Sequence, residues 1–147
     1  MIGLDTGFFV ELLRGNKQAL DIFNQISDGE EGACISCLTL YELKKLSLSD
    51  SIPLETGATL IHSIMSFCSV SWLDNLQAHE LAAALSHDLG IPGIDSLILA
   101  GLVTSNANKI YTTDKHMMIY NNKATPVILI TPTHNPKLCI KNKTAIS

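Results

Sequence analysis

The chain has 147 residues, of which 46% are hydrophobic and 16% are charged. A chain of this length and apolar content can fill the core of a single domain, which excludes global disorder. Its 14 acidic residues exceed its 10 lysine and arginine residues, so the net charge is −4. This sign is opposite to the basic surface that is typical of nucleic-acid binders, so the charge alone argues against such a partner.

No targeting or membrane signal is visible in the sequence. The first residues carry no basic region, and an acid already stands at Asp5. The longest uncharged stretch, residues 56–73, contains several serines and threonines and a histidine, so it is too polar for a membrane helix. We therefore expect a cytoplasmic protein without a membrane segment.

The four cysteines are expected to be reduced thiols. Cys34 and Cys37 have the spacing of zinc ligands, but Cys68 and Cys139 do not form the second close pair that would complete a four-ligand site. Since Cys34 and Cys37 lie in an apolar run, buried thiols of a cytosolic protein are the better interpretation.

Short apolar runs alternate with segments of helical periodicity along the chain. The runs predict strands at residues 1–4, 33–37, 67–73, 109–112 and 127–131. They are continuously apolar, which is typical of a parallel sheet buried on both faces. We therefore predict an α/β domain over residues 1–132. Residues 133–147, which hold three lysines and no acid, are predicted to form a C-terminal tail.

Four acids occupy related places in this pattern. Asp5 follows the first predicted strand, Glu42 lies in the helix after the second, Asp95 begins the helix before the fourth, and Asp114 follows the fourth. Functional sites in parallel α/β sheets form at the carboxyl ends of strands, so the four carboxylates are expected at one rim. A hard divalent cation would remove their mutual repulsion and could activate water towards a phosphodiester.

Each acid taken alone also has a structural explanation. Asp95 and Asp114 could cap the helices that they precede, and Glu42 could be a surface charge paired with Lys45. Asp5 is harder to explain in this way, because burial of an acid at the end of an apolar strand is costly.

The order of these residues resembles the PIN-domain family of nucleases over nearly the whole chain. The matching blocks are Leu4-Asp5-Thr6, Ile35-Ser36 with Glu42-Leu43, Gly90-Ile91-Pro92 with Asp95, and Thr112-Thr113-Asp114. Two departures from the family pattern concern packing. Gly101 stands where the family usually has an alanine, and Met117 and Met118 follow the fourth block where an aromatic residue is usual.

The resemblance implies a three-layer α/β/α fold with a five-stranded parallel sheet of strand order 3-2-1-4-5. It implies Mg²⁺ or Mn²⁺ as cofactor, with metal-binding and catalytic roles for Asp5, Glu42, Asp95 and Asp114. Neighbouring polar or substrate-binding roles fall to Thr6, Ser36, Thr112 and Lys115. The implied activity is that of an endoribonuclease, in which metal-activated water hydrolyses RNA and leaves a 5′-phosphate.

PIN proteins of this size are commonly VapC-like toxins of toxin–antitoxin pairs. The resemblance therefore implies an RNA substrate, a small antitoxin protein as partner, and a homodimer. Two alternatives stay open: an RNA-processing PIN nuclease without an antitoxin, and a PIN-like interaction module that has lost catalysis.

Other families fit the sequence less well. Asp5-Thr6-Gly7 is also the triplet of aspartic proteases, but those domains are mostly β-structure. A haloacid-dehalogenase-type hydrolase would need a second acid where Gly7 stands. The five histidines lack metal-ligand spacing and are expected at the surface or in packing, with only His116 near the proposed site. We expect Tyr41 and Trp72 in the core or at an interface.

Overall fold

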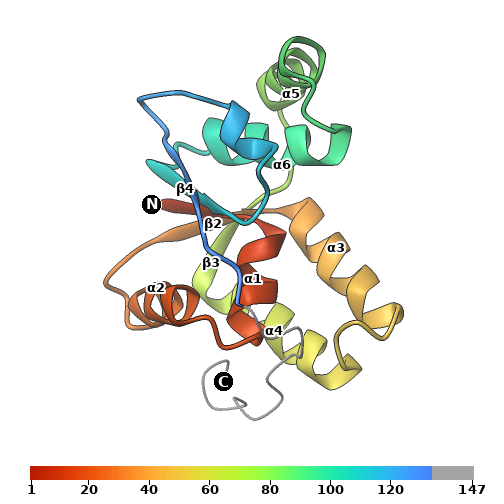
Figure 1. Cartoon of the computed structure of the whole chain (residues 1–147), viewed down its shortest axis with the longest axis vertical. Coiled ribbons are helices and arrows are strands. Elements are labelled where there is room, and N and C mark those ends of the chain that lie inside the picture. The colour runs from red at the N-terminus through yellow and green to blue at the C-terminus, as the bar shows by residue number, and fades with distance from the viewer. Residues whose placement is uncertain (134–147) are drawn as a thin grey trace.

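The computed structural model describes residues 1–133, which form a parallel sheet between two layers of helices (Figure 1). The strands are β1 (Ile2–Leu4), β2 (Ala33–Ser36), β3 (Cys68–Ser71), β4 (Lys109–Thr112) and β5 (Val127–Leu129). Their spatial order is β3-β2-β1-β4-β5, and all pairs are parallel. The fold class and the strand order implied by the resemblance are both confirmed. Apart from Thr133, the predicted tail lies outside the described residues.

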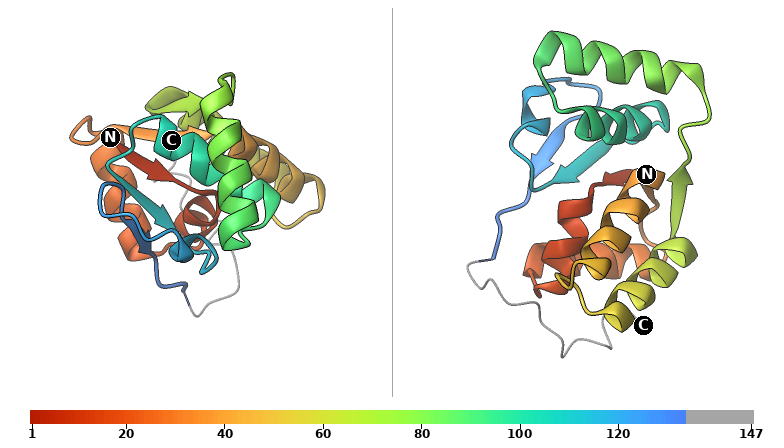
Figure 2. Two further views of the ribbon diagram at one scale, coloured as in Figure 1. Left: turned by 90° about the horizontal axis from the view of Figure 1, so that it is seen from above. Right: turned by 90° about the vertical axis from the view of Figure 1, so that its right-hand side faces the viewer.

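Within residues 1–133, six α-helices and one 3-10 helix connect the strands. They are α1 (Thr6–Leu13), α2 (Lys17–Ser27), α3 (Cys37–Leu48), α4 (Leu54–Phe67), α5 (Leu76–Leu89), α6 (Gly93–Thr104) and the 3-10 helix η1 (Met117–Ile119). Figure 2 shows α5 and α6 on one side of the sheet and α1 to α4 on the other. None of the helices in residues 1–133 is both long and apolar enough to cross a bilayer.

Alternate strand residues enter two separate cores. Ile2, Leu4 and Ile35 pack with the α1–α4 layer, whereas Cys34 and Ile110 pack with α5 and α6. Successive side chains of a strand point to opposite faces, so a sheet covered on both faces needs apolar residues at every position. This explains the continuous apolar runs in the sequence.

The third strand is shorter than the sequence predicted. Residues 67–73 were expected to be extended, but Phe67 ends α4 and β3 ends at Ser71. Leu73 has a φ of +57°, a left-handed conformation that interrupts the strand.

Two glycines explain how α5 and α6 are set against the sheet. Gly90 ends α5 in the left-handed conformation, with a φ of +68°, which glycine adopts without strain. A Cβ atom at Gly101 would lie 3.0 Å from Ser71 Oγ and 3.1 Å from Leu73 Cδ2. The glycine that departs from the family pattern therefore allows α6 to approach the end of β3.

The sheet register aligns three polar residues at one edge. Leu4 pairs with Ile35 on β2 and with Tyr111 on β4. Because the strands are parallel, the residues that follow these three end at the same level: Asp5, Ser36 and Thr112. The carboxyl edge of the three central strands therefore starts with one acid between two hydroxyl groups.

A buried glutamate in α1 joins that helix to the chain after β5. Glu11 is 2% exposed, and its carboxylate accepts hydrogen bonds of 2.9 Å from Arg14 Nη1 and from the backbone N–H of Thr133. Burial raises the pKa of Glu11, but these hydrogen bonds outweigh it, so the pKa is lowered. Sequence reasoning did not single out this residue.

Candidate active site

Asp5 is a buried acid that also begins a helix. Its side chain is 4% exposed, and its Oδ1 accepts a hydrogen bond of 2.9 Å from the backbone N–H of Phe8, which caps α1. Its Oδ2 accepts a hydrogen bond of 2.5 Å from Thr112 Oγ1. Burial raises the pKa of Asp5 to about 6, because it outweighs both hydrogen bonds, and the charges of Asp114 and Glu42 raise it further.

Thr112 connects Asp5 to Asp114. Its side chain is fully buried, and its Oγ1 accepts a hydrogen bond of 2.9 Å from the backbone N–H of Asp114 while donating to Asp5. Asp114 Oδ1 in turn accepts a hydrogen bond of 2.8 Å from the backbone N–H of His116. Asp114 thus closes the turn that leads into η1. The first residue of η1, Met117, directly follows His116.

Asp95 does not cap its helix. The N-cap of α6 is Pro92, and Asp95 is the third helical residue, so the capping alternative is wrong. Its half-buried carboxyl group forms a hydrogen bond with that of Asp114. Burial, the charge of Asp114 and this hydrogen bond raise the pKa of Asp95 to about 6, with smaller contributions from Glu42 and Asp5.

Glu42 is held by a hydroxyl group of another helix. Thr6 Oγ1 donates a hydrogen bond of 2.6 Å to Glu42 Oε1 and lies 3.2 Å from Thr39 Oγ1. Lys45, the partner that a surface role for Glu42 would require, is exposed. The buried Ser36 caps α3 by accepting a hydrogen bond of 3.2 Å from the backbone N–H of Leu38, which fixes the start of the helix that carries Glu42.

The four acids that sequence analysis singled out therefore lie at the carboxyl edge of the sheet, but Asp5 and Glu42 are outside the closest group of candidate ligand atoms among residues 1–133. Each contributes to the raised pKa of Asp5 or Asp95, which requires mutual proximity. A carboxylate oxygen from each of Asp95 and Asp114 and one imidazole nitrogen of His116 lie within 4.8 Å of one another. Lys115 is exposed next to Asp114, and its predicted role in substrate binding stays a prediction.

The donor atoms of this site suit a hard divalent cation. Carboxylate oxygens are the side-chain ligands that Mg²⁺ and Mn²⁺ prefer. Burial and the charges of the neighbouring acids raise the pKa values of Asp5 and Asp95 to about 6, so both groups are mainly ionised at neutral pH and repel their neighbours. A divalent cation would relieve this repulsion.

Comparison with known families shows to which family the chain belongs. The model of the PIN domain matches residues 2–122, so the chain belongs to the PIN-domain family. Members of this family are generally nucleases that use divalent metal ions. A search of curated proteins found no match.

The raised pKa values predict how stability changes with pH in the absence of metal. A carboxyl group whose pKa is higher in the folded than in the unfolded chain favours the folded state only while it is protonated. In EDTA, Asp5 and Asp95 should therefore lower the free energy of unfolding as pH rises from about 4 to about 6. The substitution Asp95→Asn should remove part of this loss and stabilise the chain at pH 7 by about 1 kcal/mol, once the partial exposure of Asp95 is allowed for.

Urea unfolding between pH 4 and pH 7 measures this effect, with Glu80→Gln as the control because Glu80 is an exposed acid of α5. Adding Mg²⁺ at ten times its Kd should stabilise the wild type by about 1.4 kcal/mol and the Asp95→Asn variant less. An Asp95→Asn variant that is less stable than the wild type in EDTA at pH 7 would contradict the electrostatic account.

Proposed function

We propose that this PIN domain is a metal-dependent endoribonuclease that hydrolyses RNA phosphodiester bonds. Its Mg²⁺ or Mn²⁺ ions would be held by Asp5, Glu42, Asp95 and Asp114. The observation that carries the proposal is the convergence of these four acids, from four segments of the chain, on one edge of the sheet. Acids that raise one another's pKa values destabilise the folded state. A bound divalent cation would relieve that repulsion, so the repulsion favours metal binding.

Two hydroxyl side chains next to the acids support the proposal, because they hold the carboxylates in place. Thr112 donates to Asp5 and Thr6 donates to Glu42, so two carboxylates are oriented by hydroxyl groups from other elements. Divalent ions in a carboxylate site activate water and stabilise the negative charge that develops on a phosphodiester. Lys115, which is exposed beside Asp114, is proposed to contact an RNA phosphate.

The acidic net charge is compatible with an RNA substrate. Without the four acids of the site, the remaining 10 acidic residues balance the 10 lysine and arginine residues. Bound divalent ions would therefore remove much of the repulsion between the site and the RNA backbone. RNA binding should strengthen when Mg²⁺ or Mn²⁺ is added.

Cleavage of a labelled single-stranded RNA tests the proposed function. The wild type should cleave with Mg²⁺ or Mn²⁺ and lose activity in EDTA. Each of Asp5→Asn and Asp95→Asn should lower kcat/KM on the order of 100-fold, because each removes a charge that binds the ion while keeping the side-chain shape. The Glu80→Gln control should keep full activity.

Two results would contradict the nuclease proposal. One is cleavage that continues in EDTA or at full rate in both aspartate variants. The other is RNA binding without cleavage by the metal-loaded wild type, which would favour the interaction module instead.

We further propose that residues 1–132 form one domain that acts as a cytoplasmic, homodimeric toxin under the control of a small antitoxin. Several large apolar side chains are exposed and could be covered by such partners: Tyr41, Leu48, Leu54, Trp72 and Leu76. Tyr41 and Trp72 are 53% and 59% exposed, so the core alternative for them is wrong. Cys34, Cys37 and Cys68 are free thiols, which supports a reducing compartment.

Induced expression in cells tests the toxin role. The wild type should stop growth, and the Asp95→Asn variant, expressed at the same level, should not. Co-expression of the small protein encoded next to it should restore growth. Normal growth with a wild type that cleaves RNA in vitro would contradict the toxin role and favour an RNA-processing nuclease.

A further inference from the structure

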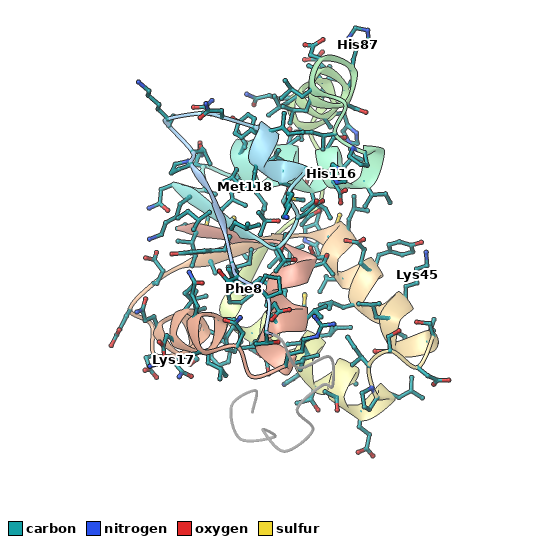
Figure 3. All side chains as sticks on the ribbon, in the orientation of Figure 1. Phe8, Lys17, Lys45, His87, His116 and Met118 are labelled. Atoms are coloured by element: carbon teal, nitrogen blue, oxygen red, sulfur yellow. The ribbon has the colours of Figure 1, made fainter. Side chains whose placement is uncertain are left out.

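His116 faces the acids of the proposed metal site. Its Nδ1 lies 3.1 Å from Asp114 Oδ1, and its backbone N–H donates to the same oxygen at 2.8 Å. Figure 3 labels His116 beside the turn into η1, on the side of the sheet where α6 begins. Its imidazole is 64% exposed, so the ring can be reached from solvent.

The turn that carries His116 is held in place by the burial of the residue that follows it. Met117, the next residue, is 1% exposed and packs in the core that contains α6. Its Sδ lies 3.5 Å from Thr112 Oγ1, the hydroxyl group that also contacts Asp5 and the backbone of Asp114. Burial of Met117 therefore holds the imidazole of its neighbour at the rim of the acidic site.

The spacing of the donor atoms suits a shared ion. One imidazole nitrogen of His116 and one oxygen from each of Asp95 and Asp114 lie within 4.8 Å of one another. Two ligands of a single divalent ion, each about 2.1 Å from it, are separated by about 3 to 4 Å. Small movements of these side chains would bring all three atoms onto one ion.

We propose that His116 is an additional ligand of the metal bound at Asp95 and Asp114. This proposal rests on the proposed function and goes beyond it, since the nuclease account needs carboxylates alone. Imidazole nitrogen binds later first-row ions such as Co²⁺ and Zn²⁺ better than Mg²⁺, which prefers oxygen ligands. His116 therefore sets the metal preference of the site and favours the first-row ions over Mg²⁺.

The chain provides a matched control for this proposal. His87 on α5 has its Nδ1 2.8 Å from Asp88 Oδ1, so it makes the same histidine–aspartate contact as His116. Within residues 1–133, the cluster of Asp95, Asp114 and His116 is the one group of three or more candidate ligands. His87 is outside it and should contribute nothing to tight metal binding.

Titration of the full chain with CoCl₂ and with MgCl₂ tests the proposal, using the wild type, His116→Ala, His87→Ala and Asp95→Asn. Visible absorption and calorimetry report affinity. Proton NMR of the Co²⁺ form reports a hyperfine-shifted imidazole N–H, which arises only from a histidine that coordinates the ion. The wild type and His87→Ala should show this resonance. The His116→Ala variant should lose it and bind Co²⁺ on the order of 10-fold more weakly, with its Mg²⁺ affinity unchanged.

The outcomes separate this proposal from the proposed function. If His116→Ala keeps the shifted resonance and the wild-type Co²⁺ affinity while Asp95→Asn loses binding, the role of His116 is overturned and the carboxylate site stands. If the wild type binds neither ion, both proposals are overturned. Equal losses of Co²⁺ and Mg²⁺ affinity in His116→Ala would also overturn the assignment of metal preference to the imidazole.

Discussion

The carboxylate of Asp5 is buried at the end of the central strand, and neighbouring groups are placed to form hydrogen bonds with it. A buried charge without partners is costly, so the fold supplies the backbone N–H of Phe8 and the hydroxyl group of Thr112. These two contacts join β1 to α1 and to β4. Because Thr112 also holds the backbone of Asp114, the position of one buried acid determines the position of a second. The pKa of Asp5 is nevertheless raised to about 6, so these two contacts do not fully offset the cost of its burial, which a shared cation would reduce further.

Much of the fold, and the meeting of acids at one edge of the sheet, were predictable from the sequence. Continuous apolar runs indicate strands covered on both faces, and the two cores of Leu4 and Cys34 explain why. Parallel strands bring their carboxyl ends to one edge, so acids such as Asp5 and Asp114, which follow strands, were expected to meet there. The strand order came from the family resemblance. Periodicity does not specify which strands are neighbours.

Other features depend on side-chain packing that a linear pattern does not contain. The hydrogen bond from Thr6 to Glu42 joins two helices through residues that are 36 positions apart in the chain, and no local spacing signals it. Asp95 precedes an apolar helical run and so matched a capping pattern, but α6 begins two residues earlier, at Gly93. His116 lies in no ligand motif, and its approach to Asp95 follows from the burial of Met117. Glu11 was missed because its partner Thr133 is 122 residues away.

The central claim is that the carboxylates at the edge of the sheet form a binding site for a divalent cation. Anomalous diffraction from crystals grown with Mn²⁺ tests it most directly, because Mn²⁺ gives an anomalous signal and Mg²⁺ does not. The account predicts a strong anomalous peak within bonding distance of carboxylate oxygens of Asp95 and Asp114, and no such peak in crystals of the Asp95→Asn variant. Well-ordered acids with no peak among them at saturating Mn²⁺, or a peak only at another place on the chain, would contradict it.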